Sequence, residues 1–164
     1  MNSSNKKCGC YIPAKEENIK QNYPNQKTLK IKWQRLITEG ETCPRCGSTE
    51  QELEKATDKL KQALIPLGIK VFLEKEEMNI SEFKSDPLQS NRIWINGQPI
   101  EGLIKGAVGQ SPCCDVCGPS DCRTIELNGE KHETIPADLI IQASLIVVND
   151  ILNSNNNNSC CNNY

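Results

Sequence analysis

Hydrophobic side chains recur at two spacings in the first half of the chain, and each spacing predicts an element. Polar and apolar residues alternate over residues 28–37 and again over 69–73, which predicts two half-buried strands. Between them, apolar residues return at every third or fourth position, which predicts an amphipathic helix over residues 48–65. Because this helix supplies the crossover, we expect the two strands to be parallel and to form a βαβ unit.

The predicted helix has recognisable signals at both ends. Ser48, with Gln51 three residues later, forms a candidate capping box, and Pro66 marks the end of the helical pattern. A CPRC sequence at residues 43–46 directly precedes this helix. We therefore expect the first cysteine of this sequence at the turn between the first strand and the helix N-terminus.

Two Asn-Gly pairs predict hairpins in the second half of the chain, over residues 92–100 and 123–135. Pro136 then opens a final helix over residues 137–151. The cysteine-rich residues 113–122, between the hairpins, are expected to form an ordered loop. The whole pattern predicts an α/β fold with a mixed four- or five-stranded sheet flanked by helices and carrying a Cys-rich loop insertion.

Composition limits how much of the chain can fold. Only 37% of the 164 residues are hydrophobic, and the Asn-rich ends lack apolar periodicity. We expect a disordered N-terminal tail over residues 1–27, one domain over residues 28–152, and a disordered Asn-rich tail over residues 153–164.

Charge and hydropathy exclude several functional classes. Nineteen Lys and Arg residues against 21 Asp and Glu residues leave a net charge of −2, which argues against a nucleic-acid partner. We find neither a long apolar run nor a secretory signal, so no membrane association is predicted and the expected compartment is the cytoplasm. In that compartment, ten cysteines indicate redox chemistry or metal ligation.

The CPRC sequence has a physical reason to be reactive. A helix N-terminus favours the thiolate of Cys43 and lowers its pKa, and Arg45 adds a nearby positive charge. Cys46 is placed to resolve a mixed disulfide formed on Cys43. The alternative is half of a structural zinc site, because zinc sites use the same Cys-X-X-Cys spacing.

The densest thiol cluster consists of Cys113, Cys114, Cys117 and Cys122. Together these four thiolates suit zinc, an iron–sulfur cluster, copper(I) or arsenite. Disulfides, buried thiols or a second redox pair are the alternatives. Three weaker signals carry no chemistry: His132 is expected at an edge or exposed position, Trp94 is expected in the core, and no role is assigned to the tail cysteines Cys8, Cys10, Cys160 and Cys161.

Four sequence blocks resemble a known family: TCPRC at residues 42–46, SNRIWING at 90–97, GQSPCCDVCG at 109–118 and CRT at 122–124. The order of strand, CPRC, helix and strand is similar to the thioredoxin and glutaredoxin superfamily. The four blocks resemble an uncharacterised prokaryotic family, domain of unknown function family 2703. This resemblance implies a thioredoxin-like fold over residues 28–150 and no assigned reaction.

The sequence departs from thioredoxins at Asn91, which stands where those proteins carry a cis-proline. A cis bond before a residue other than proline costs about 2.5–4 kcal/mol, so we expect a trans Ser90–Asn91 peptide. The leading functional hypothesis is a thiol–disulfide oxidoreductase acting on a disulfide-containing substrate or a thiol reductant through Cys43 and Cys46. The alternatives are a protein that binds zinc or another soft metal or metalloid without redox turnover, with Cys43 and Cys46 as further ligands, and an interaction module.

Overall fold

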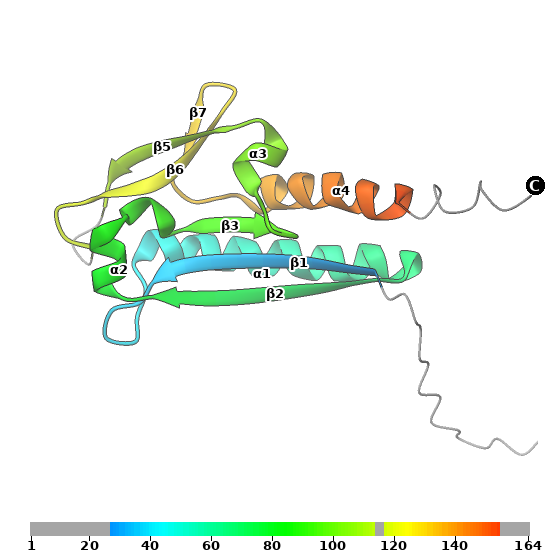
Figure 1. The fold of residues 1–164 in the computed structure, drawn as a ribbon, viewed down its shortest axis with the longest axis horizontal. Helices are drawn as coiled ribbons and strands as arrows, with labels where there is room; N and C mark the ends of the chain where they lie inside the picture. Colours follow the sequence, from blue (N-terminus) through cyan, green and yellow to red (C-terminus); the bar gives the residue numbers. More distant parts are fainter. Residues whose placement is uncertain (1–26, 114–116, 155–164) are drawn as a thin grey trace, which may run out of the picture.

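The computed structural model describes residues 27–113 and 117–154. Nearly all of both expected tails lies outside these residues, and so do Cys114 and the four tail cysteines. The described chain contains two separate β-sheets and four α-helices (Figure 1).

The first sheet has four strands in the order β2-β1-β3-β4. β1 (Lys27–Leu36) pairs in parallel with β2 (Ile69–Met78) and antiparallel with β3 (Arg92–Ile95). β4 (Gln98–Pro99) extends the sheet from β3 through a hairpin. This mixed four-stranded sheet, together with its flanking helices, confirms the predicted α/β fold class.

The core lies between this sheet and two long helices. α1 (Pro44–Leu64) packs against β2 and α4 (Ala137–Asn153), and α4 also contacts β1 and β3. The inward side chains of β1 alternate along the strand and are completely buried: Leu29, Ile31 and Trp33. The alternation and the helical spacing therefore predicted the correct faces.

Trp94 does not lie in the core as expected. It is only partly buried, and Lys32 and Arg92 place their charged groups 5.1 and 4.8 Å from its ring centroid. Trp94 pairs with Lys32 across β1 and β3, on the face opposite that of Ile93 and Ile95. The prediction failed because short apolar runs do not reveal which alternating face is buried.

Short helical segments connect the strands. η1 (Ile65–Leu67) follows α1, α2 (Ile80–Ser85) follows β2, and η2 (Pro87–Gln89) leads into β3. Asn79 and Glu82 form a reciprocal capping box at the start of α2.

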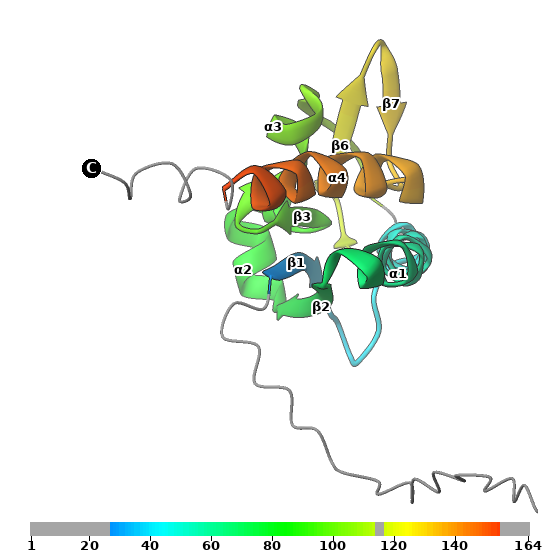
Figure 2. The same cartoon turned by 90° about the vertical axis from the view of Figure 1, so that its right-hand side faces the viewer.

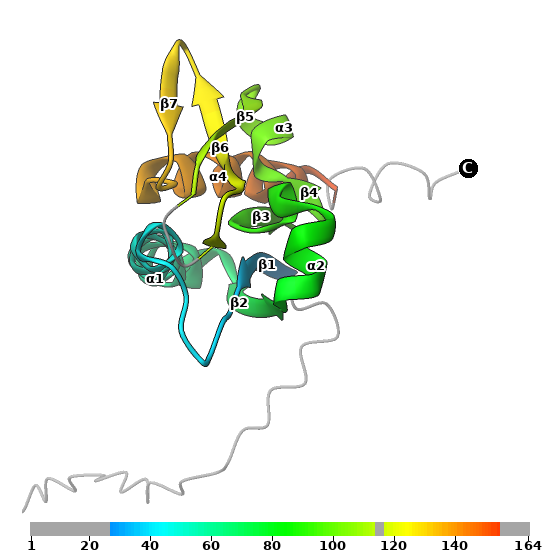
Figure 3. The ribbon, with the colours of Figure 1, turned by 90° about the vertical axis from the view of Figure 1, so that its left-hand side faces the viewer.

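The second sheet was not predicted as a separate unit. α3 (Ile100–Ile104) leads into β5 (Ala107–Pro112), which pairs with β6 (Asp121–Leu127), and β6 pairs with β7 (Glu130–His132). All pairs in this sheet are antiparallel. Figures 2 and 3 show the β6–β7 hairpin extending away from the four-stranded sheet. β5 escaped prediction because its residues show no clear apolar alternation.

Both predicted Asn-Gly turns are present. Asn96 and Gly97 have φ values of 46° and 81°, and Asn128 and Gly129 have values of 53° and 84°. These left-handed conformations are the reason that tight hairpins select Asn-Gly.

The start of the long helix was predicted four residues too late. α1 begins at Pro44, and Ser48 lies inside the helix, where its Oγ donates to the carbonyl oxygen of Pro44 at 3.0 Å. The capping box at Ser48 and Gln51 was therefore wrong. Cys43 is the N-cap, and Pro44 suits the first helical position because its ring fixes φ at a helical value.

Candidate functional site

Cys43 and Cys46 occupy the junction of β1 and α1. The backbone N–H of Cys46 donates to the Sγ of Cys43 at 3.5 Å, so the Cys43 sulfur acts as the helix cap. Both side chains are only 3% exposed. A helix N-terminus favours negative charge, and this arrangement therefore favours a thiolate at Cys43 over one at Cys46.

Cys46 has the opposite electrostatic environment. Its hydrogen bond to Cys43, followed by burial and repulsion from the Cys43 charge, raises the pKa of the Cys46 thiol far above its ordinary value. Hydrogen bonds from Ser90 and Thr42 act in the other direction but are smaller. This environment therefore favours the protonated form of Cys46.

Ser90 is a site residue that the sequence patterns did not single out. Its Oγ lies 3.9 Å from the Cys46 Sγ and accepts the backbone N–H of Leu36 at 3.1 Å. Ser90 is 3% exposed, and this hydrogen bond joins the end of β1 to the segment that leads into β3. Its available signals were its place at the start of the SNRIWING block and its position next to Asn91.

Asn91 holds the loop that faces the CPRC turn. The Trp33 Nε1 donates to its Oδ1 at 3.1 Å, and its Nδ2 donates to the Glu133 carbonyl oxygen at 3.2 Å. Its φ of 56° is left-handed, and the Ser90–Asn91 peptide is trans, as expected. The Asn91 amide therefore ties this loop to Trp33 on β1 and to the segment that precedes α4.

Arg45 points towards the second cysteine cluster. Its Nη2 donates to the carbonyl oxygen of Pro112 at 3.0 Å and lies 3.1 Å from the Glu133 Oε2. Pro112 directly precedes Cys113. Arg45 therefore connects the CPRC turn to the cysteine-rich loop, and its effect on the charge of Cys43 stays a prediction.

The cysteine-rich loop is closed by a disulfide between Cys113 and Cys122, with a Cα–Cα distance of 5.0 Å. Cys122 lies on β6, and Cys113 follows the last residue of β5. Cys117 completes a cluster in which the three sulfur atoms all lie within 4.8 Å of one another. Three of the four predicted ligands therefore come together, and the fourth, Cys114, lies outside the described residues.

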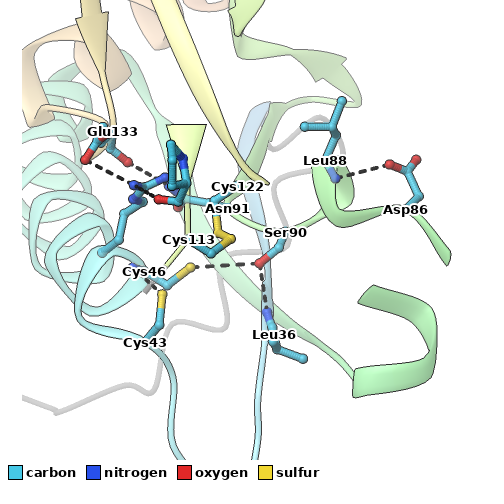
Figure 4. Close-up of a disulfide and its surroundings, with 12 residues drawn as sticks. Leu36, Cys43, Cys46, Asp86, Leu88, Ser90, Asn91, Cys113, Cys122 and Glu133 are labelled. Atoms are coloured by element: carbon cyan, nitrogen blue, oxygen red, sulfur yellow. Dashed lines mark hydrogen bonds and ion pairs between the residues drawn. A yellow bond between two sulfur atoms is a disulfide. The ribbon is translucent and has the colours of Figure 1, made fainter. Parts of the chain in front are cut away.

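Two sets of contacts bring the cysteine sites together. Arg45 reaches Pro112 on one side, and on the other side the Arg123 Nη1 donates to the Leu88 carbonyl oxygen at 3.2 Å, two residues before Ser90. Cys43, Cys46, Cys117 and Cys122 are buried in the same core, and Cys113 packs against it. Figure 4 shows both CPRC thiols in the surroundings of the Cys113–Cys122 disulfide.

His132 lies at the edge of the second sheet, as expected, but its side chain is only 13% exposed. None of the helices in the described part of the chain is both long enough and apolar enough to cross a membrane.

The fold and these two sites define a cysteine-rich α/β protein that contains a buried dithiol and a disulfide-closed loop. Residues 29–144 match the family described as domain of unknown function DUF2703, and the chain belongs to this family. An uncharacterised protein from Archaeoglobus fulgidus is 47% identical over 112 residues, which cover 68% of this chain and 82% of that relative. No solved structure matches the chain.

Proposed function

We propose that this protein is a thiol–disulfide oxidoreductase in which Cys43 is the nucleophile and Cys46 the resolving thiol. The asymmetry between the two sulfurs carries this proposal. The Cys43 Sγ accepts the backbone N–H of Cys46 at the helix N-terminus, whereas the interaction with Cys43 and burial raise the pKa of the Cys46 thiol. The CPRC turn within a βαβ unit, followed by an antiparallel hairpin, supports a thioredoxin-like affiliation.

The chemistry follows from this asymmetry. The Cys43 thiolate attacks a disulfide, forms a mixed disulfide and releases one substrate thiol. The Cys46 sulfur then attacks Cys43 as its proton leaves, which releases the second thiol and forms the Cys43–Cys46 disulfide. A thiol reductant returns the pair to the dithiol. A cytoplasmic location fits this cycle, because cytosolic disulfides are usually transient and catalytic or redox-sensing.

A trapping experiment tests the proposal. The reduced full chain carrying Cys46→Ser is mixed with glutathione disulfide, and the peptides that carry a glutathione adduct are mapped by mass spectrometry. The expected product is a stable glutathione adduct on Cys43, because the resolving thiol is absent. Cys160→Ser serves as the control for loss of a thiol elsewhere. A Cys46→Ser protein that carries no adduct on Cys43 contradicts the assignment of the nucleophile.

The sulfur cluster supports a second candidate function, which is the binding of a soft metal or metalloid. Once reduced, Cys113, Cys117 and Cys122 would supply three thiolates from positions already within 4.8 Å of one another. Three sulfurs suffice for an arsenite-type ligand, and zinc would require a fourth donor. Because Cys113 and Cys122 are joined in the disulfide, this function requires prior reduction.

A further inference from the structure

Burial limits what the CPRC thiols can reach from the surface. Cys43 and Cys46 are each 3% exposed, so a bulky protein disulfide cannot approach them without local opening. Within the protein, the same thiols share a core with Cys122, and Cys113 packs against that core. A disulfide that needs no access from solvent therefore lies in their own surroundings (Figure 4).

Two independent contacts hold this disulfide against the CPRC turn. The Arg45 guanidinium binds the carbonyl oxygen next to Cys113, and its side chain is only 12% exposed. On the other side, Arg123, next to Cys122, binds Leu88 and forms a buried ion pair with Glu101. Leu88, which accepts the Arg123 hydrogen bond, lies two residues before Ser90, and the Ser90 hydroxyl lies beside the Cys46 sulfur. One end of the disulfide is thus tied to the CPRC turn through Arg45, and the other end is tied to the segment that carries Ser90.

We propose that the Cys43–Cys46 dithiol reduces the Cys113–Cys122 disulfide of its own chain, so that the two cysteine pairs form an internal electron relay. This inference rests on the proposed function and names the substrate of that site. It assigns a redox role to the cysteine-rich loop beyond any structural one. Electrons that enter at one pair leave through the other.

The exchange balances without an outside reagent. The Cys43 thiolate attacks one sulfur of the Cys113–Cys122 disulfide, the S–S bond between these residues breaks, and the departing sulfur takes up a proton. The Cys46 sulfur then attacks Cys43 and loses its proton, and the second loop sulfur leaves as a thiol. One disulfide forms and one is reduced, so two electrons move from the first pair to the second. The proton that Cys46 loses balances one loop thiol, and the proton on the other comes from the solvent that took up the Cys43 proton when the thiolate formed.

The relay also controls the candidate metal cluster. While the disulfide is intact, Cys113 and Cys122 cannot act as thiolate ligands. After the exchange, these two residues and Cys117 are three thiols in one cluster. The redox state of the CPRC pair therefore determines whether the loop can bind a soft ion.

The test maps disulfides in the full chain. Protein carrying Cys46→Ser is prepared with the Cys113–Cys122 disulfide intact, quenched with acid, alkylated and digested without reductant. The expected new species is a Cys43–Cys113 or Cys43–Cys122 cross-link. In parallel, dithiothreitol reduction of the Cys113–Cys122 disulfide is timed in wild type and in Cys43→Ala. Loss of Cys43 should slow this reduction roughly tenfold or more, because the exchange rate depends on access to the disulfide.

The outcomes separate the relay from the oxidoreductase function. In the control variant Cys160→Ser, which lacks a thiol elsewhere, dithiothreitol should reduce the Cys113–Cys122 disulfide at the wild-type rate. If Cys46→Ser traps glutathione on Cys43 but forms no internal cross-link, and Cys43→Ala reduces at the wild-type rate, the relay is wrong and the oxidoreductase proposal stands. If Cys43 forms a mixed disulfide with neither glutathione nor the loop, both proposals are wrong.

Discussion

Arg45 and Pro112 join two segments that lie 67 residues apart in the sequence, through a 3.0 Å hydrogen bond from the Arg45 Nη2 to the Pro112 carbonyl oxygen. The same guanidinium group pairs with Glu133, before α4. Arg45, which belongs to the CPRC turn, thus positions the cysteine-rich loop beside that turn. A residue inside a Cys-X-X-Cys sequence is for this reason a positioning residue for the second site.

Arg45→Met should release the loop while keeping most of the buried side-chain volume. We expect the free energy of unfolding to fall by roughly 1.5 kcal/mol, the lower end of the range for hydrogen bonds to charged groups. Hydrogen exchange should accelerate at the Cys113 amide, which bonds to Ser120. The matched control is Lys61→Met, since Lys61 pairs with Asp58 at an exposed position. Equal exchange rates in the two variants would argue against the positioning role.

Ser90→Ala should weaken both the fold and the resolving step. The substitution leaves the buried Leu36 N–H without its acceptor, which costs about 1–3 kcal/mol. It also removes a hydrogen bond that lowers the Cys46 pKa, so Cys46 should ionise less readily. Urea denaturation and the rate of mixed-disulfide resolution measure the two effects. Ser90→Cys restores a donor and acceptor, although a weaker one, and should recover part of both losses.

Asn91→Pro should destabilise this protein. Proline fixes φ near −65°, whereas Asn91 requires 56°, and proline also removes the acceptor for the buried Trp33 N–H. Asn91→Gly can adopt the left-handed backbone conformation and should lose only the side-chain hydrogen bonds. This loss should lower the free energy of unfolding by about 1–3 kcal/mol. Thermal denaturation should rank wild type above Asn91→Gly and Asn91→Gly above Asn91→Pro. A proline variant as stable as wild type would show that the observed loop conformation is not required.

Glu52 links the two long helices in a pH-dependent way. Its carboxylate accepts the backbone N–H of Ala137 at 3.0 Å, and hydrogen bonds from Lys55 and then Ala137 lower its pKa. Because the pKa of Glu52 is lower in the folded state, its ionised carboxylate stabilises the fold at pH values above 4.5, the ordinary pKa of the carboxyl group. This stabilisation is lost as the pH falls through the pKa of the folded state. Glu52→Ala should therefore lower Tm at pH 7, and the difference from wild type should shrink in acid. A difference that does not change with pH would exclude the ionised carboxylate as its source.

The strong periodic patterns predicted the βαβ unit because burial of Leu29, Ile31 and Trp33 requires alternation along β1. The two Asn-Gly pairs predicted both hairpin turns, because these turns need left-handed backbone. The start of α1 was misplaced because a cysteine N-cap is not a usual capping signal, although Pro44 marked the first turn. The loop cysteines could not be paired from spacing alone, because four neighbouring thiols allow several disulfides and metal sets. Contacts between distant residues, such as those of Ser90, leave no local pattern.

Metal binding should depend on the redox state of the loop. Fully reduced protein, titrated with arsenite, should bind at the Cys113, Cys117 and Cys122 cluster, and protein with the Cys113–Cys122 disulfide should lack this site. Cys117→Ser should remove one of three sulfurs and abolish this binding event, whereas Cys160→Ser should leave it intact. Mass spectrometry of the native protein counts the bound arsenic. Equal arsenic content in the reduced Cys117→Ser and wild-type proteins would contradict the cluster.

The division of roles between Cys43 and Cys46 is most directly tested by site-resolved alkylation of the reduced full chain across a pH series. Each thiol is labelled for a fixed time with iodoacetamide and quantified by peptide mapping. Cys43 is expected to react near neutral pH, whereas Cys46 should stay unreacted in alkaline buffer because its interaction with Cys43 and its burial raise its pKa. Denatured protein, in which both thiols should react alike, provides the reference. Preferential labelling of Cys46 at neutral pH would contradict the assignment of Cys43 as the nucleophile.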